Sequence, residues 1–477
     1  MPLRSRLRLR ATLRRLRLPM AATAPRPATA RCCFEAASTP RRAASASQWP
    51  PPRLTLPSLP TLEGLAPLAI DSQIKITTIT QLNWHVVAMK ARNVATLLLV
   101  TISFQVLAGI VAQLETSPSP APEPAPEAKA PMPPPLLPAI FVFGDGALDV
   151  GNNNDLPEGD EMGDAPRATR PYYGIDSPNS QPTGRFSNGY NIADFIAKAL
   201  GFAMSPPAYA SLPVPSPTTM QRFTGVNYAS AYAGLRESTN AQMTISLSDQ
   251  VKNFAATRSQ LEALLGGREP LNNLLSESLF LIGVGTMDLL PCCNFYLTFP
   301  LKDNKTEVQR LIELYESTLA TLHGMGARKF GVINVGPLGR LPSVHMSRHS
   351  EDPSIDRRAT EFNAKLGLLL SNLTTKLNGF RYSFADFYGF TNATFANPSG
   401  FGFLNTKYAC CTDPCSPDMY VAPCDSRSEY WFWDNWYTTE KASKLAAAAF
   451  CSGNAFAMPV NIKELAAMKG SMRDREL

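Results

Sequence analysis

Short apolar runs alternate with longer amphipathic stretches from residue 139 onward, and this alternation restricts the fold more than any other feature of the sequence. The apolar runs lie at 139–143, 279–285, 330–336 and 382–387. Helix-like spacing of apolar residues covers 191–200, 246–265, 306–325, 355–377 and 439–450. Apolar strands separated by helices are typical of a parallel sheet covered on both faces. The pattern predicts a flavodoxin-like, three-layer α/β/α domain over residues 139–456, with any site at the carboxyl ends of the strands.

The positive net charge comes from the first 88 residues. Residues 1–88 hold twelve Arg and one Lys against three acidic residues, a charge of +10, whereas the 477-residue chain carries +6, which leaves −4 for the remainder. This Arg-, Ala- and Pro-rich extension fits either an organelle transit peptide or an over-extended start upstream of a true initiator at Met89. Because the remainder is slightly acidic, the charge gives no reason to expect a nucleic-acid partner.

Residues 89–112 have the pattern of a secretory signal peptide. Lys90 and Arg92 precede an apolar run from Val94 to Ala112, which ends in small residues. If the chain starts at Met1, the same run could remain as a type II membrane anchor. Both interpretations place the following domain in the secretory lumen or outside the cell. Residues 113–138 are rich in Pro, Ala, Ser and Glu and predict an extended linker, and residues 457–477 are expected to form a C-terminal tail.

Two further features agree with an oxidising compartment. Asn304, Asn372 and Asn392 each begin an Asn-x-Thr glycosylation acceptor. Seven cysteines follow residue 112, and we predict disulfides among them, with one cysteine left free or paired with another chain: Cys292, Cys293, Cys410, Cys411, Cys415, Cys424 and Cys451. A zinc site is the alternative for the four within residues 410–424, but no His lies near them. We therefore expect no metal, and nothing in the sequence calls for another cofactor.

Several stretches resemble the motif blocks of a known enzyme family. They are Phe143–Asn154, which includes Gly144-Asp145-Gly146-Ala147-Leu148, Pro182–Gly189, Gly326–Phe330, Gly336–Gly339, Ala409–Cys411 and Tyr430–Asp434. Together they are similar to the plant-type GDSL esterase/lipase family of SGNH hydrolases over residues 139–456. The resemblance implies ester hydrolysis by a nucleophilic Ser that a His and an Asp activate. It also implies an oxyanion hole made of backbone N–H groups and an Asn side chain.

Most of the positions that carry this chemistry are occupied by other residues. The resemblance places Gly146 where the family has its Ser, Met287 where it has the oxyanion Asn, and Tyr437 where it has the His. Glycine has no side chain, a thioether donates no hydrogen bond, and a phenol is a poor base at pH 7. Asp434 alone is retained from the triad.

The second block departs as well. The family usually has Gly-Gly where this chain has Ala231-Tyr232, and we expect the Tyr232 side chain to intrude on the site. The family commonly has a Cys where this chain has Arg340, which accounts for the odd cysteine count.

Other polar residues offer little replacement. We expect His323 at a solvated helix end, and His345 and His349 in a loop, so none of them is expected to act as the base. Asp145 and Asp149 flank Gly146 and are expected to shape the turn. Aromatic residues near the last block either line a ligand groove or pack in the core: Tyr430, Trp431, Phe432, Trp433, Trp436 and Tyr437.

The sequence therefore predicts a secreted, glycosylated GDSL-type protein of the apoplast or cell wall that no longer hydrolyses esters and acts by binding or as a scaffold. The alternative is a weak ester hydrolase with a rebuilt site that uses Tyr437 or a displaced His. The resemblance implies an acyl, lipid or acylated-carbohydrate ligand, and no protein partner is indicated.

Overall fold

The computed structural model describes residues 134–157, 165–212, 222–290, 304–347, 352–412, 415 and 422–469, together with Gln105. The predictions for residues 1–88, for nearly all of 89–112 and for most of the linker lie outside these residues, as do those for Cys292, Cys293 and His349. None of the helices in the described residues is long and apolar enough to span a bilayer.

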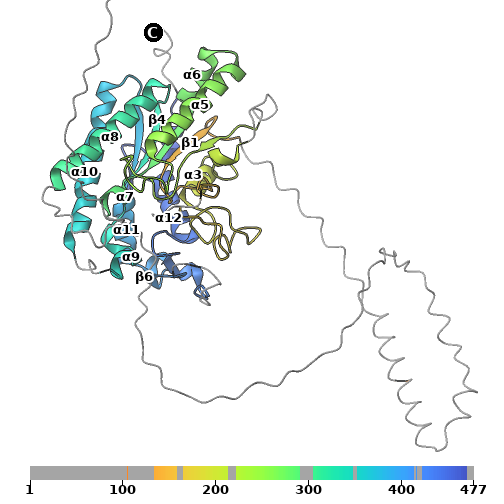
Figure 1. The fold of residues 1–477 in the computed structure, drawn as a ribbon, viewed down its shortest axis with the longest axis vertical. Helices are drawn as coiled ribbons and strands as arrows, with labels where there is room; N and C mark the ends of the chain where they lie inside the picture. Colours follow the sequence, from red (N-terminus) through yellow and green to blue (C-terminus); the bar gives the residue numbers. More distant parts are fainter. Residues whose placement is uncertain are drawn as a thin grey trace, which may run out of the picture. The chain divides into compact units, whose positions relative to one another are not determined.

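A six-stranded sheet in the order β2-β1-β3-β4-β5-β8 forms the centre of the domain (Figure 1). The first five strands are parallel, and β8 pairs antiparallel with β5. Their bounds are β1 (Ile140–Gly144), β2 (Gly225–Asn227), β3 (Leu279–Gly283), β4 (Lys329–Ile333), β5 (Arg381–Ala385) and β8 (Ala457–Met458). The four apolar runs predicted as strands are β1, β3, β4 and β5.

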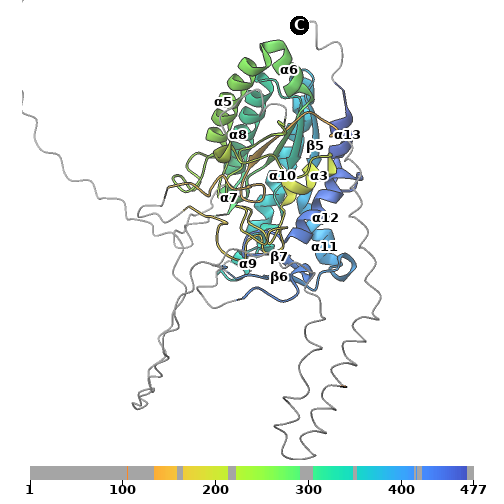
Figure 2. The same cartoon turned by 90° about the vertical axis from the view of Figure 1, so that its right-hand side faces the viewer.

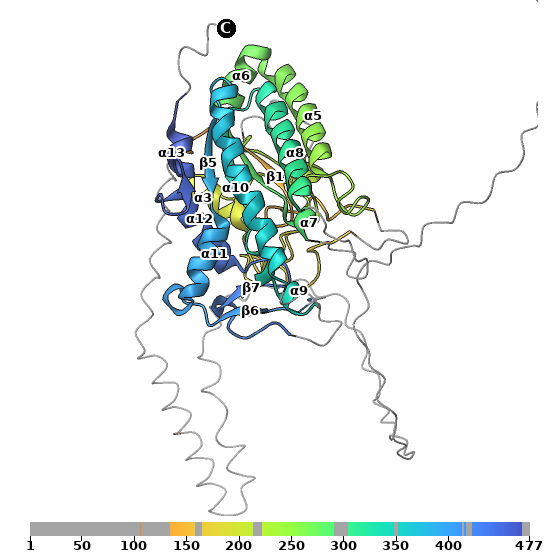
Figure 3. The same ribbon diagram turned by 90° about the vertical axis from the view of Figure 1, so that its left-hand side faces the viewer.

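Helices cover both faces of this sheet, which gives three layers (Figures 2 and 3). One face shares its core with α5 (Leu247–Leu265), α6 (Arg268–Glu277), α8 (Asn304–Gly324) and α10 (Pro353–Lys376). The other face packs against α3 (Ile192–Ala199), α11 (Phe387–Ala396), α12 (Glu440–Cys451) and α13 (Ile462–Ala467). In β1, Phe141 and Phe143 point to the first layer and Ile140 and Val142 to the second, because successive strand side chains alternate. The predicted three-layer α/β/α fold is confirmed.

The predicted helices begin and end where local capping residues place them. The Asn191 side chain caps α3 and pairs with Asp194 in a capping box, and the Ser246 side chain caps α5. Gly266 ends α5 in the left-handed conformation, which glycine adopts without strain. Each of the five predicted helices matches an observed helix to within about two residues at either end.

Short elements gather at the end of the domain toward which the parallel strands point. They are η2 (Tyr209–Ser211), α7 (Thr286–Leu289), η3 (Leu338–Arg340), α9 (Pro342–His345), η4 (Ser399–Phe401), η6 (Arg427–Glu429) and a two-stranded parallel sheet of β6 (Asn405–Ala409) and β7 (Tyr430–Phe432). Figure 3 shows α9, β6 and β7 together at this end.

Residues that we assigned to a tail add two elements to the fold. β8 extends the sheet beside β5, and α13 buries Ile462 and Leu465 completely against it. The buried Lys329 ammonium donates to Glu277 Oε2 at 2.8 Å and to the Ala466 carbonyl at 3.1 Å, which ties α13 to β4 and α6. The packed domain therefore continues beyond residue 456.

Candidate functional site

The residues at the predicted catalytic positions come together where the parallel strands end. Gly146 lies in the turn after β1, Ala231 follows β2, Met287 lies in α7 just after β3, and Tyr437 follows β7. Met287 and Tyr437 line one cavity, and Gly146 contacts the Tyr437 ring. A site at the carboxyl ends of the strands is therefore where the topology puts these residues.

The Tyr437 ring occupies the space that a side chain at position 146 would need. A Cβ atom built on Gly146 would overlap the Tyr437 hydroxyl and lie 2.5 Å from Cζ and 2.7 Å from Cε1. Ordinary carbon contacts lie at about 3.5–4.0 Å. Gly146 has no left-handed φ, so a neighbouring side chain rather than the backbone excludes a larger residue here.

Tyr437 itself is buried and its hydroxyl is unpaired. The ring packs against Phe186 with 4.9 Å between centroids. The hydroxyl has no hydrogen-bond partner among the described residues. Burial raises the pKa of this phenol well above its usual value of 10, and the nearby Asp145 carboxyl raises it further. Tyr437 therefore stays protonated at pH 7 and supplies no base.

Asp434 now holds a turn and a neighbouring tyrosine. Its Oδ1 accepts the backbone N–H groups of Trp436 at 2.8 Å and Tyr437 at 2.7 Å, and its Oδ2 accepts the Tyr173 hydroxyl at 2.8 Å. These donors occupy both oxygens of a carboxylate that is 4 % exposed. The retained triad residue thus has a structural set of partners.

The groups predicted to form the oxyanion hole either make another hydrogen bond or lack a donor. The Ala231 N–H donates to Asp149 Oδ2 at 3.0 Å, so it points away from any bound carbonyl. Tyr232 adopts a left-handed backbone with φ of 67°, a conformation that usually falls to glycine. Its ring lies 6.4 Å from that of Trp436, measured between centroids, and it is near enough to Tyr437 to raise the pKa of that phenol, although it does not line the cavity next to the site. Met287 places a buried thioether where the family's amide is expected.

A partly open cavity of about 100 Å³ lies beside Gly146. Apolar side chains from both helical layers and from the strand ends form most of its wall: Leu148, Ile192, Val284, Met287, Ile333, Val335, Leu338, Leu341, Phe387, Trp431, Phe432 and Trp436. Four of the six aromatic residues near the last motif line it, namely Trp431, Phe432, Trp436 and Tyr437, whereas Trp433 is fully buried in a neighbouring cluster.

Among the described residues that line this cavity, Asp145 alone carries a carboxyl. Its Oδ1 accepts the Ala147 N–H at 3.1 Å, which is the turn-shaping role that we expected. Burial raises the pKa of the carboxyl to about 7, and repulsion from Asp288 adds to the effect. The sequence suggested the turn and a groove lined by aromatic residues, but not that Asp145 borders that groove, because the cavity walls come from segments far apart in the chain.

Histidine does not contribute to this site in the part of the chain that the structure describes. His323 lies at the end of α8, just before β4 begins, and its Nε2 is 2.8 Å from the Asn378 carbonyl oxygen. His345 ends α9 and does not line the cavity. Burial lowers the pKa of both rings.

Comparison with known proteins agrees with the motif resemblance. The family model described as GDSL-like Lipase/Acylhydrolase matches residues 140–450, which is most of the described domain. The chain belongs to the GDSL-like lipase/acylhydrolase family. It is 33 % identical to GDSL esterase/lipase At1g71691 of Arabidopsis thaliana over 352 residues, covering 70 % of this chain and 86 % of that protein. It is 34 % identical to GDSL esterase/lipase At1g29670 of the same plant over 349 residues, covering 69 % and 92 %.

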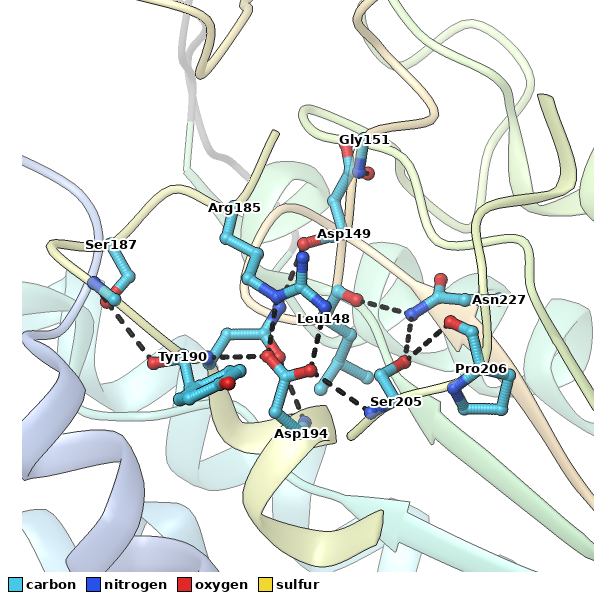
Figure 4. A network of polar contacts seen from close by, with 12 residues as sticks. Leu148, Asp149, Gly151, Arg185, Ser187, Tyr190, Asp194, Ser205, Pro206 and Asn227 are labelled. Carbon is cyan, nitrogen blue, oxygen red and sulfur yellow. Dashed lines mark hydrogen bonds and ion pairs between the residues drawn. The ribbon is translucent and has the colours of Figure 1, made fainter. Parts of the chain in front are cut away.

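A network of ion pairs and hydrogen bonds holds the turns of the GDSL-like domain near the candidate site. Arg185 forms a bidentate ion pair with Asp194, with 2.6 Å from Nε to Oδ2 and 2.8 Å from Nη2 to Oδ1 (Figure 4). Asp194 also accepts the Ser205 N–H at 3.1 Å, and Asn227 Nδ2 donates to Ser205 Oγ at 3.1 Å and to the Leu148 carbonyl at 2.8 Å.

Asp149 connects this network to the turn after β1. Its Oδ1 accepts the N–H groups of Gly151 and Asn152, each at 2.8 Å, and its Oδ2 accepts Ala231. Burial raises its pKa to about 6, while the three N–H donors and Arg185 oppose that rise. Asp149 therefore shapes the turn, as expected, and also binds β1 to the segment after β2.

Two disulfides cross-link cysteines within the cysteine-rich loop of this GDSL-family chain. Cys410 pairs with Cys424, and Cys411 pairs with Cys415. The Cys411 N–H donates to the Trp433 carbonyl at 2.7 Å, so the loop is tied to the segment that carries Asp434. Cys451 is free and buried in α12, and burial raises the pKa of its thiol to about 12. No group of residues among those described could hold a metal ion.

The three predicted glycosylation acceptors lie on helices. Asn304 begins α8, Asn372 is exposed on α10, and Asn392 is half-buried on α11. Asn372 therefore offers the more accessible acceptor side chain of the last two.

Proposed function

We propose that this protein is a secreted, catalytically silent member of the GDSL-like family that acts by binding a ligand or by serving as a scaffold. One observation carries the proposal: the buried Tyr437 ring fills the space of a side chain at position 146. Gly146, at the position of the expected nucleophile, and Tyr437, at the position of the expected base, therefore fit each other sterically. A family site in which only the Ser had been lost would still have an open position above the turn.

The remaining chemistry supports the same conclusion. Covalent ester hydrolysis needs a nucleophile, a base in contact with it, and donors for the oxyanion. Tyr437 is held protonated, and the Ala231 N–H is bonded to Asp149. In a serine protease, loss of the Ser or the His alone lowers turnover by roughly 10⁶.

Secretion is supported by the signal-peptide pattern at residues 89–112 and by the two disulfides, because stable disulfides belong to oxidising compartments. The apolar cavity supports an acyl or lipid-like ligand in place of a substrate.

The test is hydrolysis of short- and medium-chain p-nitrophenyl esters by the protein recovered from a secretory host. We expect no turnover above that of buffer, and none in the Tyr437→Phe or Asp434→Asn variants. Turnover in the natural protein that either substitution abolishes would overturn the proposal in favour of a rebuilt hydrolase. If there is no turnover, thermal shifts with fatty acids and acylated sugars separate ligand binding from scaffolding. A protein that acts only as a scaffold shows no shift with any of them.

A further inference from the structure

Asp145 and the cavity beside it form an unusual combination of groups. A carboxyl lies in a wall that is otherwise apolar or neutral, and Trp431 and Trp436 face the same cavity. The cavity holds about 100 Å³, whereas an engineered apolar cavity of about 150 Å³ admits benzene. The space therefore suits about four non-hydrogen atoms, which can be the end of a longer molecule that enters through the open side.

Among the described residues, no positively charged group is found to offset the charge of the Asp145 carboxyl. The titratable groups around it among the described residues are Asp288 on α7, Tyr315 on α8 and Tyr437 after β7, and none of them is positively charged. Thr286 and the Ala147 N–H are its hydrogen-bonding neighbours. An anionic ligand would therefore meet a carboxyl and two phenols without a positive group to offset its charge.

We infer that this cavity binds small uncharged molecules with a carbonyl oxygen and a short alkyl group, that the neutral Asp145 carboxyl donates a hydrogen bond to that oxygen, and that ionisation of Asp145 releases the ligand. This inference rests on the proposed non-catalytic function and names its ligand class. The ionised form of a carboxylic acid of the same size is excluded, because its negative charge would enter a mostly apolar wall and lie near Asp288.

The pH dependence has a definite direction. With a pKa of about 7, Asp145 is neutral and able to donate below pH 7, and it is ionised and unable to donate above pH 7. When only one state binds, the apparent Kd rises in proportion to the loss of that state. Between pH 5.5 and pH 8.5 we therefore expect the affinity to fall by about tenfold or more.

The experiment compares 2-hexanone with pentanoate, two molecules of equal heavy-atom count that differ in charge. Binding is measured on the full chain by tryptophan fluorescence and by titration calorimetry at pH 5.5 and 8.5. We expect 2-hexanone to bind at least tenfold more tightly at pH 5.5 than at pH 8.5. Pentanoate should bind more weakly than 2-hexanone at pH 5.5, where only a minority of it is the uncharged acid, and should not bind at pH 8.5.

Three variants separate the causes. Asp145→Asn keeps a donor that does not titrate, so it should bind 2-hexanone at both pH values within about threefold of the natural affinity at pH 5.5. Asp155→Asn, which alters an exposed carboxyl in the following turn, should keep the natural pH dependence. Ala147→Leu enlarges an exposed residue of the cavity wall and should weaken binding at least fivefold at both pH values, even if Asp145→Asn fails to fold.

Equal binding of pentanoate and 2-hexanone, an unchanged pH profile in Asp145→Asn, or no binding of 2-hexanone at pH 5.5 would overturn the inference. None of these results would restore ester hydrolysis, so the non-catalytic function stands or falls separately by the p-nitrophenyl ester assay.

Discussion

Asp145 and Asp149 lie four residues apart in the same turn, yet their surroundings differ. Asp149 accepts three backbone N–H groups and feels the charge of Arg185, and its pKa is about 6. Asp145 accepts one backbone N–H, borders an apolar cavity and faces Asp288, and its pKa is about 7. Asp149 belongs to a hydrogen-bonded network with Arg185 and Asp194. Asp145 lies near the Tyr437 hydroxyl, which has no hydrogen-bond partner among the described residues.

This difference shows that the fold of this GDSL-family domain and its expected chemistry depend on largely separate side chains. The paired network holds the turn after β1, the segment after β2 and the start of α3 together, and it uses the backbone N–H of Ala231, a predicted oxyanion donor, for that purpose. Substitutions at Gly146, Met287 and Tyr437 therefore leave the turn intact.

The largest expected effect is in the paired network. Arg185→Met leaves the buried Asp194 carboxylate without its cation and should lower the free energy of unfolding by about 3–5 kcal/mol. The matched control is Arg427→Met, because Arg427 pairs with Asp176 in the same bidentate manner but nearer the surface. This substitution should lower the free energy of unfolding by about 0.2–1 kcal/mol. Urea unfolding of both variants at pH 7 gives the comparison, and equal losses would contradict it.

A pH-dependent effect is expected at Asp145. Its folded-state pKa lies above the unfolded value of 3.8, so the folded protein holds a proton that the unfolded chain releases between pH 4 and pH 7. Stability attributable to Asp145 is therefore present below pH 4 and is lost as the pH rises to about 7. Asp145→Asn should change stability little at pH 4 and raise it by up to ~4 kcal/mol at pH 8.

Asp149→Asn should change stability much less than Asp145→Asn at pH 8. Its raised pKa of about 6 favours the uncharged amide by up to ~3 kcal/mol at that pH. The amide also turns one acceptor oxygen into a donor that faces a backbone N–H, which costs about 1–3 kcal/mol and largely offsets the gain. Urea unfolding across the pH range measures both variants. Equal gains in both would show that the two carboxyls do not differ as described.

An intermediate effect tests the fit between Gly146 and Tyr437. Gly146→Ala should lower the free energy of unfolding by about 1–3 kcal/mol, because the new methyl group overlaps the Tyr437 ring. In a Tyr437→Ala background the same change should cost less than about 0.5 kcal/mol. The coupling energy from this double-mutant cycle, measured by thermal unfolding, should thus exceed about 0.5 kcal/mol. Additive losses would mean that the ring does not exclude the side chain.

The smallest effect concerns single hydroxyl groups. Tyr437→Phe removes a buried hydroxyl without a partner and should raise stability by about 1 kcal/mol. Tyr173→Phe removes the donor to Asp434 Oδ2 and should lower stability by about 1–2 kcal/mol. Melting temperatures measured side by side should shift in opposite directions.

Much of the fold could be predicted from local patterns. β1, β3, β4 and β5 are continuous apolar runs, and α5 and α10 carry both the apolar spacing and the capping residues of long helices. β2, with three residues, and α13, with six, were not anticipated, because such short elements have too few residues to establish a period and form only against an existing sheet.

The candidate site could also be predicted only in part from the sequence. The replaced residues at 146, 287 and 437 are visible in the sequence, because motif blocks on either side mark their positions. The relation between them is not visible. Gly146 and Tyr437 are separated by 290 residues in the chain and meet only after β1 and the segment after β7 reach the same end of the sheet.

By itself, the sequence determined the layered α/β fold, because strand and helix periods follow from local side-chain spacing. It also predicted which of the family's catalytic residue types are replaced. Only the tertiary structure decided that the Tyr437 ring fills the space beside Gly146, that the Ala231 N–H is bonded to Asp149, and that Asp145 borders an apolar cavity. The physical reason is that overlap, hydrogen bonding and the loss of hydration depend on distances between segments that local sequence does not specify.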